Sequence, residues 1–157
     1  MNMRFSHSVA TTPAPVVRSQ ANLAHFCDSH GLDCVLITSQ DAFLSEYNIP
    51  GNNQRYALSG FSGSTGDGVF LSGPLAARLE LYTPFLLFVD GRYHLQAEQE
   101  TCPEEVRLIK FPVAQTLDEA VLEWLKSVPA DLRVGFDASR TSWKRFEAVR
   151  AVCEERK

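Results

Sequence analysis

The chain has 157 residues, of which 45% are hydrophobic and 22% charged, and its formal net charge is −4. A chain of this length buries roughly 68–70% of its unfolded surface, which is enough for one core without disulfide or metal staples. The excess of 19 Asp and Glu over 15 Lys and Arg argues against partners bound through a broad positive field, namely nucleic acids and anionic membranes. The composition indicates one globular domain and excludes fibrous, disordered and disulfide-scaffold chains.

Cysteine usage and the chain's apolar runs bear on its compartment. The four cysteines are far apart in the sequence and lack the close pairs typical of zinc sites. The first 17 residues contain no apolar run of the signal-peptide kind. The longest apolar stretch, Phe85–Val89, is far shorter than the ~20 residues that cross a bilayer. We therefore expect a cytoplasmic protein with reduced thiols and no membrane partner.

The first half of the chain predicts a helix followed by a buried strand. Residues 1–15, with several Thr and Pro, are expected to form a flexible lead-in, and residues 16–157 the domain. Helical periodicity begins at Val16 and ends at Gly31. Residues 34–37 are apolar throughout, as in a strand covered on both faces. A short helical turn is expected at residues 41–47, and an exposed loop at residues 50–53.

The second half alternates between predicted strands and helices. Strands are expected at residues 69–71, 78–83, 85–89, 105–111 and 133–136. A helix at residues 92–99 would be capped by Asp90. Thr116 and Glu119 form a capping-box pattern at the start of another helix. The last helix, from Ser142 onward, reaches Lys157 without a stop signal, so we expect the chain to be part of a longer one.

No complete catalytic motif is visible. His94 and Glu98 lie one helical turn apart and could present two metal ligands, although a solvated pair on an exposed face is the favoured interpretation. The four glycines from Gly60 to Gly68 could cradle a phosphate. However, Asp67 would place a negative charge against that phosphate, and an apolar strand follows where a helix is needed. A tight connection that needs glycine backbone geometry is favoured.

Two carboxylates and a group of planar side chains remain as candidates. Asp90 and Asp137 each follow an apolar strand, so they could share a magnesium ion or divide acid and base roles, or they could cap turns. Planar groups rich in hydrogen-bonding atoms are enriched at recognition surfaces. The candidate substrate or partner surface comprises Arg55, Tyr56, Phe61, Arg92 and Tyr93, with Asp90 orienting the last two. A purely structural role, such as a salt link from Asp90 to Arg92, stays open.

Several motifs occur together in an order that resembles a known family. They are Thr38-Ser-Gln-Asp41, Ser45-Glu-Tyr47, Ser59-Gly-Phe-Ser-Gly-Ser-Thr-Gly66 and Asp90-Gly-Arg-Tyr93 followed by Gln96-Ala97. This order is similar to that of the N-terminal domain of the Xaa-Pro aminopeptidases (aminopeptidase P) in the creatinase/prolidase family. The resemblance extends from about residue 16 to the end of the chain.

The chain departs from this family pattern at three places. Gln54 stands where the family usually has the first of two arginines, so the role of that arginine pair is in doubt here. Val89 replaces a usual Thr. The segment between Pro74 and Pro84 is longer than usual, which predicts an extended hairpin.

The resemblance implies a ribonuclease-H-like α/β fold, with a mixed sheet of five or six strands and helices on both faces. It also implies that catalysis takes place in a separate C-terminal pita-bread domain, absent from this chain, where two divalent ions, often manganese, activate a hydroxide. No metal ligands of that domain lie in these residues. In such enzymes the N-terminal domain covers the active site, limits which peptides enter and supports a homodimer.

The leading hypothesis is therefore a non-catalytic N-terminal domain of a cytoplasmic Xaa-Pro aminopeptidase, inactive alone. Its partners would be its own catalytic domain, a second subunit and the peptide substrate. Two alternatives stay open: a stand-alone peptide- or protein-binding module, and a magnesium-dependent ribonuclease-H-like hydrolase that uses Asp90 and Asp137. The peptidase assignment rests on the resemblance, because a fold does not fix a function.

Overall fold

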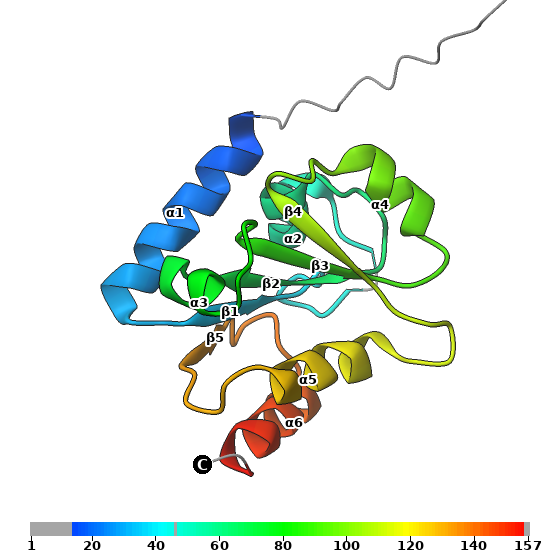
Figure 1. Cartoon of the computed structure of the whole chain (residues 1–157). Helices are drawn as coiled ribbons and strands as arrows, with labels where there is room; N and C mark the ends of the chain where they lie inside the picture. Colours follow the sequence, from blue (N-terminus) through cyan, green and yellow to red (C-terminus); the bar gives the residue numbers. More distant parts are fainter. Residues whose placement is uncertain (1–13, 46, 156–157) are drawn as a thin grey trace, which may run out of the picture.

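A five-stranded mixed sheet with helices on both faces forms the centre of the molecule (Figure 1). The computed structural model describes residues 14–45 and 47–155. The strands lie in the order β4 (Val106–Lys110), β3 (Phe85–Val89), β2 (Asp67–Leu71), β1 (Cys34–Ile37) and β5 (Val134–Phe136). Strand β2 is antiparallel to both of its neighbours, whereas β3 pairs in parallel with β4 and β1 with β5. The predicted mixed α/β sheet is confirmed.

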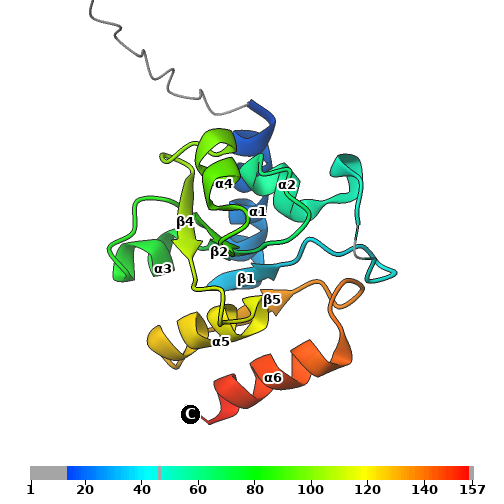
Figure 2. The same cartoon turned by 90° about the vertical axis from the view of Figure 1, so that its right-hand side faces the viewer.

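The apolar character of the central strands explains why both sheet faces are covered. Every residue of β1, β2 and β3 is buried, as expected for strands packed between two helical layers. One face carries α1 (Ala14–His30), α2 (Gln54–Ser59) and α4 (His94–Glu100). The other carries α3 (Gly73–Arg78), α5 (Leu117–Ser127) and α6 (Trp143–Glu154). Figure 2 shows α5 and α6 together on their side of the sheet.

Local signals placed several elements correctly. The strand at residues 34–37 matches β1, and the capping box of Thr116 and Glu119 is present at α5. Ser142 caps α6 by accepting a hydrogen bond from the backbone N–H of Arg145. Helix α1 begins at Ala14, at the end of the expected lead-in; residues 1–13, like Glu46, lie outside the described residues.

The strand predicted at residues 78–83, and with it the extended hairpin, is wrong. The segment instead begins with helix α3, whose first turn is fixed by the Ser72 side chain accepting from the backbone of Leu75 and by Pro74 near its start. The chain leaves this helix through Glu80 in a left-handed conformation, φ +55°. Ser72 and Pro74 together form a helix-start signal, which the strand prediction at residues 78–83 did not take into account.

Three loop assignments also need correction. Residues 41–44 form a turn in place of a helix, because the Asp41 carboxylate accepts from the backbone N–H groups of Phe43 and Ser45 at 2.9 and 3.0 Å. Asp90 does not cap α4, which begins at His94. The predicted exposed loop at residues 50–53 contains a 3₁₀ turn, η1 (Pro50–Asn52), and runs into helix α2, which the sequence analysis missed.

Candidate functional site

The candidate residues come together around the glycine-rich turn at residues 60–66, beside the ends of α2 and β3. The Phe61 and Tyr93 rings pack edge to face with their centroids 5.9 Å apart. The hydroxyls of Ser64 and Tyr93 are 2.6 Å apart and share a hydrogen bond. The turn is thereby joined to the loop that follows β3, so the two distant motifs of the sequence form one site.

Arg55 occupies the interior of this turn. Its side chain is completely buried, and its two terminal nitrogens donate to the backbone carbonyls of Gly63 and Gly66. The guanidinium carbon lies 4.8 Å from the centre of the Phe61 ring, in cation–π geometry. Burial lowers the pKa of Arg55 to about 10, so the guanidinium stays charged at neutral pH. We call Arg55, Phe61, Gly63 and Gly66 the arginine clamp.

The arginine clamp corrects one part of the predicted surface. Arg55 and Phe61 are both 0% exposed, so neither belongs to a substrate or partner surface. A fork of five donors suits this position, because one guanidinium binds two carbonyls that would otherwise be buried without a donor. Their role is to hold the glycine-rich turn in shape.

The glycines of the turn are required by packing. A Cβ at Gly63 would lie 2.3 Å from the Phe61 ring, and Gly66 has φ +148° with Phe88 O only 3.1 Å from where a Cβ would be. Asp67, which follows, is 1% exposed and forms an ion pair with Arg145 of α6. The interpretation of this cluster as a tight connection rather than a phosphate cradle therefore agrees with the structure.

The second arginine of the candidate set lies on the surface. Arg92 bonds Asp90 through Nη2 at 2.8 Å and Nε at 3.1 Å, while 71% of its side chain remains exposed. Its guanidinium carbon is 5.4 Å from the Tyr93 ring centre. The hydrogen bonds from the Arg92 side chain hold the pKa of Asp90 below its usual range. Asp90 thus orients Arg92, and the exposed guanidinium is able to meet an anionic or carbonyl group.

Tyr56 lines a small polar hollow beside the turn. The hollow has a volume of about 170 Å³. Its lining residues carry no charge: Ser39, Tyr47, Asn48, Pro50, Asn53, Tyr56, Ser62, Gly63 and Ser64. Hydroxyl and amide groups of this kind suit hydrogen bonds to neutral polar groups such as peptide amides.

The sheet order argues against a shared ion between Asp90 and Asp137. They follow β3 and β5, which β2 and β1 separate, so the strand spacing places them about 14 Å apart. Asp137 instead accepts hydrogen bonds from Gln54 at 3.0 Å and from Ser139. The proposed magnesium site at these two residues is wrong. Over residues 14–45 and 47–155 no group of three or more His, Cys, Asp or Glu is placed to hold a metal.

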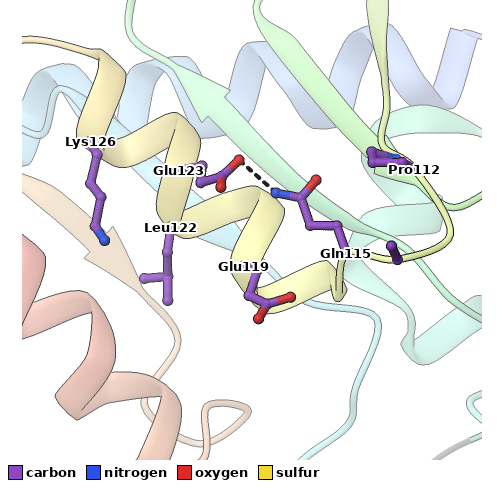
Figure 3. A pocket seen from close by; sticks show the side chains of 7 residues that line it. Pro112, Gln115, Glu119, Leu122, Glu123 and Lys126 are labelled. Atoms are coloured by element: carbon purple, nitrogen blue, oxygen red, sulfur yellow. Dashed lines mark hydrogen bonds between the residues drawn. The ribbon is translucent and has the colours of Figure 1, made fainter.

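The remaining histidine candidate has structural partners. His94 Nε2 lies 3.1 Å from the Val89 carbonyl, and Glu98 pairs with Lys110. The hollow along α5 also lacks a catalytic cluster. Gln115 donates a hydrogen bond to Glu123 at 2.6 Å, and Leu122 and Lys126 also line the hollow. Figure 3 draws this bond as a dashed line. Neither place supplies a catalytic set.

Sequence reasoning missed two sets of long-range arginine contacts around the site. Arg145 of α6 contacts Asp67 and also Asp118 at 3.3 Å, which joins β2 to α5 and α6. Arg140 donates to the carbonyls of Gln40 and Asn52 at 3.2 and 2.7 Å. Apart from the contact between Arg145 and Asp118, these bonds connect residues about 80 to 100 positions apart. No local sequence signal could have revealed the pairs.

Comparisons with known proteins agree with this fold. The family model of the creatinase/prolidase N-terminal domain matches residues 20–157. Xaa-Pro aminopeptidase 1 of Dictyostelium discoideum is 30% identical over 99% of this chain and 23% of its own length. Xaa-Pro aminopeptidase ApepP of Drosophila melanogaster is 32% identical over 81% of this chain and 19% of its own length. The chain spans about a quarter or less of these two relatives.

Solved structures show the same arrangement. An X-prolyl aminopeptidase from Caenorhabditis elegans, described as a cytosolic enzyme with a di-nuclear active site, has a TM-score of 0.64 and 23% identity. The match covers 89% of this chain and 23% of that one. The N-terminal domain of the cytoplasmic peptidase PepQ from Mycobacterium tuberculosis H37Rv has a TM-score of 0.59 and 20% identity, with 88% and 87% covered.

The described helices include none that is both long and apolar enough to span a membrane. The glycine-rich turn and the Asp90-Gly-Arg-Tyr93 segment are the parts of the structure that contain the motifs on which the sequence resemblance was based. With the family model covering most of its length, the chain belongs to the creatinase/prolidase N-terminal domain family.

Proposed function

We propose that this chain is the non-catalytic N-terminal domain of a longer, cytoplasmic, metal-dependent Xaa-Pro aminopeptidase. In that enzyme it covers the active site, restricts the peptides that enter and supports a homodimer. The hydrolytic centre, with two divalent ions such as manganese, belongs to the catalytic domain. The observation that carries the proposal is the match of 99% of this chain to only 23% of a Xaa-Pro aminopeptidase.

The exposed part of the site supplies the peptide-facing surface in this proposal. Arg92 can meet a carbonyl or carboxylate of a peptide, and the uncharged hollow beside Tyr56 can accept amide groups. Tyr93 lies between the two, hydrogen-bonded to the glycine-rich turn. The buried arginine clamp holds this surface in place without touching the substrate.

Apolar side chains after β1 supply the contact with the catalytic domain. Phe43, Tyr47 and Ile49 are 89%, 74% and 72% exposed, which is unusual for three large apolar groups so close in sequence. The base of this segment is fixed, because Arg140 bonds carbonyls on either side of it, at Gln40 and Asn52. A fixed base with an apolar tip is suited to docking against another protein surface.

Peptide hydrolysis tests the proposal. The purified 157-residue chain with Mn²⁺ should leave an Xaa-Pro peptide intact, whereas the product of the longer reading frame should cleave it. Hydrolysis that copurifies with the short chain, or a reading frame that stops at Lys157, would overturn the proposal.

Substitutions in the protein encoded by the longer reading frame test the proposed peptide-facing surface. Arg92→Ala should raise KM several-fold with little change in kcat, because it removes a binding group and no reacting group. Arg78→Ala is the matched control, since Arg78, at the end of α3, is an exposed arginine paired with an aspartate, Asp131. Equal kinetic effects of the two substitutions would remove Arg92 from the substrate surface.

The polar hollow favours one second candidate, a stand-alone peptide-binding module. Its uncharged hydroxyl and amide lining needs no catalytic domain to bind a peptide backbone. Titration of a proline-containing peptide into the 157-residue chain separates the candidates. Saturable binding lost in Tyr56→Ala favours the module, and absence of binding favours the enzyme domain.

A further inference from the structure

The two edges of the sheet differ in chemistry. Strand β4 places Arg107 and Lys110 on its exposed positions, and Lys110 pairs with Glu98. Charges of this kind protect an edge strand from pairing with another chain. Strand β5 forms the other edge with the sequence Val-Gly-Phe, and no described strand pairs with its outer side. The β5 edge therefore lacks charged residues within the strand.

Apolar surface accompanies the β5 edge on both faces of the sheet. On the α1 side, Gly135 has no side chain and leaves a groove of about 690 Å³ whose lining includes Leu23 and Phe26. Phe26 is 47% exposed. On the opposite side, Phe136 packs on Phe146, which packs on Trp143. Trp143 is 73% exposed, so apolar groups are available beside this edge above and below the sheet.

The charges that flank β5 are self-complementary. Arg133 precedes the strand and Asp137 follows it, both at two residues from Gly135. In an antiparallel pair of two β5 strands centred on Gly135, the register places Arg133 of each copy opposite Asp137 of the other. Arg133 is exposed, and 35% of the Asp137 side chain is exposed, although its Oδ2 also pairs with Arg140 Nε of the same chain at 3.3 Å. Opposite charges directly across two strands stabilise such a pair.

We propose that the β5 edge is a dimer interface, at which two copies of this chain pair antiparallel about a two-fold axis through Gly135. The two sheets then form one continuous sheet, and each groove is covered by the other copy. A two-fold axis requires a self-complementary patch, which the Arg133 and Asp137 pair provides. The proposal rests on the dimer part of the proposed function and is independent of the peptidase activity.

Charge reversal tests the register. Sedimentation should show a dimer for the unmodified chain, and monomers for Arg133→Glu and for Asp137→Arg, because each substitution opposes like charges twice. An equimolar mixture of the two variants should form a heterodimer, since both pairs then join opposite charges. The matched control Arg107→Glu on the β4 edge should stay dimeric. Thermal unfolding of each variant checks that it is folded.

A cysteine at the axis provides a test that does not depend on Asp137, whose internal bonds support its own loop. Directly opposed residues of an antiparallel pair have Cα atoms about 4.5–5.5 Å apart, within disulfide range. Gly135→Cys in a Cys153→Ser background should therefore form a disulfide-linked dimer on mild oxidation. The added Cβ lies 2.8 Å from the flexible end of Leu32, which must move, and 3.3 Å from a methyl group of Val35, which must shift slightly. Arg107→Cys in the same background should stay monomeric on a denaturing gel.

The alternative occupants of the β5 edge give different results. If the chain stays monomeric at protein concentrations up to about 1 mM, any dimer would have a Kd weaker than that concentration, and the proposal is overturned. A dimer that neither charge-reversal variant dissociates also overturns the proposal, because the homodimer would then use another interface. The third outcome concerns the longer protein. If it is monomeric, and if the Gly135 amide is protected from hydrogen exchange at every dilution, then another part of the same chain covers the β5 edge. This result would also overturn the proposal.

Discussion

Two Arg-Tyr dipeptides in this chain have the same local sequence and opposite environments. Arg55, in the first, is completely buried and donates to two glycine carbonyls. Arg92, in the second, keeps 71% of its side chain exposed, pairs with Asp90 and lies over the ring of Tyr93. The difference arises from what surrounds each arginine: a turn of glycines that closes over Arg55, and an open loop after β3. A planar cation is therefore a scaffold in one place and a recognition group in the other.

Removal of the buried arginine should have the largest effect. Arg55→Ala leaves the carbonyls of Gly63 and Gly66 without their donor, at about 1–3 kcal/mol each, and opens a cavity under Phe61. We expect a loss of about 4 kcal/mol or more in the free energy of unfolding, measured by urea denaturation. Arg55→Lys should recover little of it, because one ammonium does not reproduce the planar fork. Full recovery by Lys would show that charge alone matters.

The ion pair of Arg145 with Asp67 is the next test of burial. Arg145→Leu leaves the Asp67 carboxylate, whose side chain is 2% exposed, without its cation. The expected loss in unfolding free energy is about 3 kcal/mol, the lower end for a broken buried pair. Adding Asp67→Asn should restore part of it. Arg150→Leu, which removes a cation from exposed pairs on the same helix, should leave the urea midpoint nearly unchanged.

Substitution of a glycine in the turn around Arg55 should cause a smaller loss in the free energy of unfolding. Gly63→Ala forces a methyl group into the Phe61 ring and should destabilise the chain by about 1–3 kcal/mol through overpacking. Gly73→Ala is the control, because no atom lies within 4 Å of its added Cβ. Urea denaturation of both variants measures the difference. If Gly63→Ala matched the control, the packing account of the glycine-rich turn would be contradicted.

The exposed arginine should have the smallest effect on stability, and that effect should depend on pH. The hydrogen bonds from Arg92 lower the pKa of Asp90, so this carboxyl stabilises the fold above its ordinary pKa and loses that contribution as the pH falls below about 4. Arg92→Ala should leave the thermal midpoint near neutrality unchanged and reduce the slope of stability against acid pH. Thermal melts at several pH values test both expectations.

The sequence predicted the elements whose signals are local. The apolar run of β3 and the capping box before α5 depend on neighbouring residues, and both appear as expected. Helix α2 was missed because only six residues form it, between the Asn53 cap and left-handed Gly60. A helix this short draws its stability from tertiary packing, which local periodicity does not reveal.

The sequence predicted which residues belong to the candidate site better than it predicted what each of them does. The sequence analysis grouped Arg55 and Phe61 in one candidate surface, and the structure places the two side chains in contact but buries both. The burial of Arg55 and Phe61 follows from the way the glycine-rich turn closes over them. Residue types alone do not determine this closure. Gln54, the departure from the family pattern, bonds Asp137 across 83 positions. Such a pair is visible only after the sheet order brings β5 beside β1.

Titration of the isolated 157-residue chain with Mn²⁺ by calorimetry tests the central claim most directly. The claim is that this domain contributes to the active site of the longer enzyme and contains no hydrolytic metal centre of its own. The account predicts no saturable uptake of Mn²⁺ at neutral pH and no Xaa-Pro turnover in the same sample. Stoichiometric binding of two ions, accompanied by peptide cleavage that is lost on chelation, would contradict it.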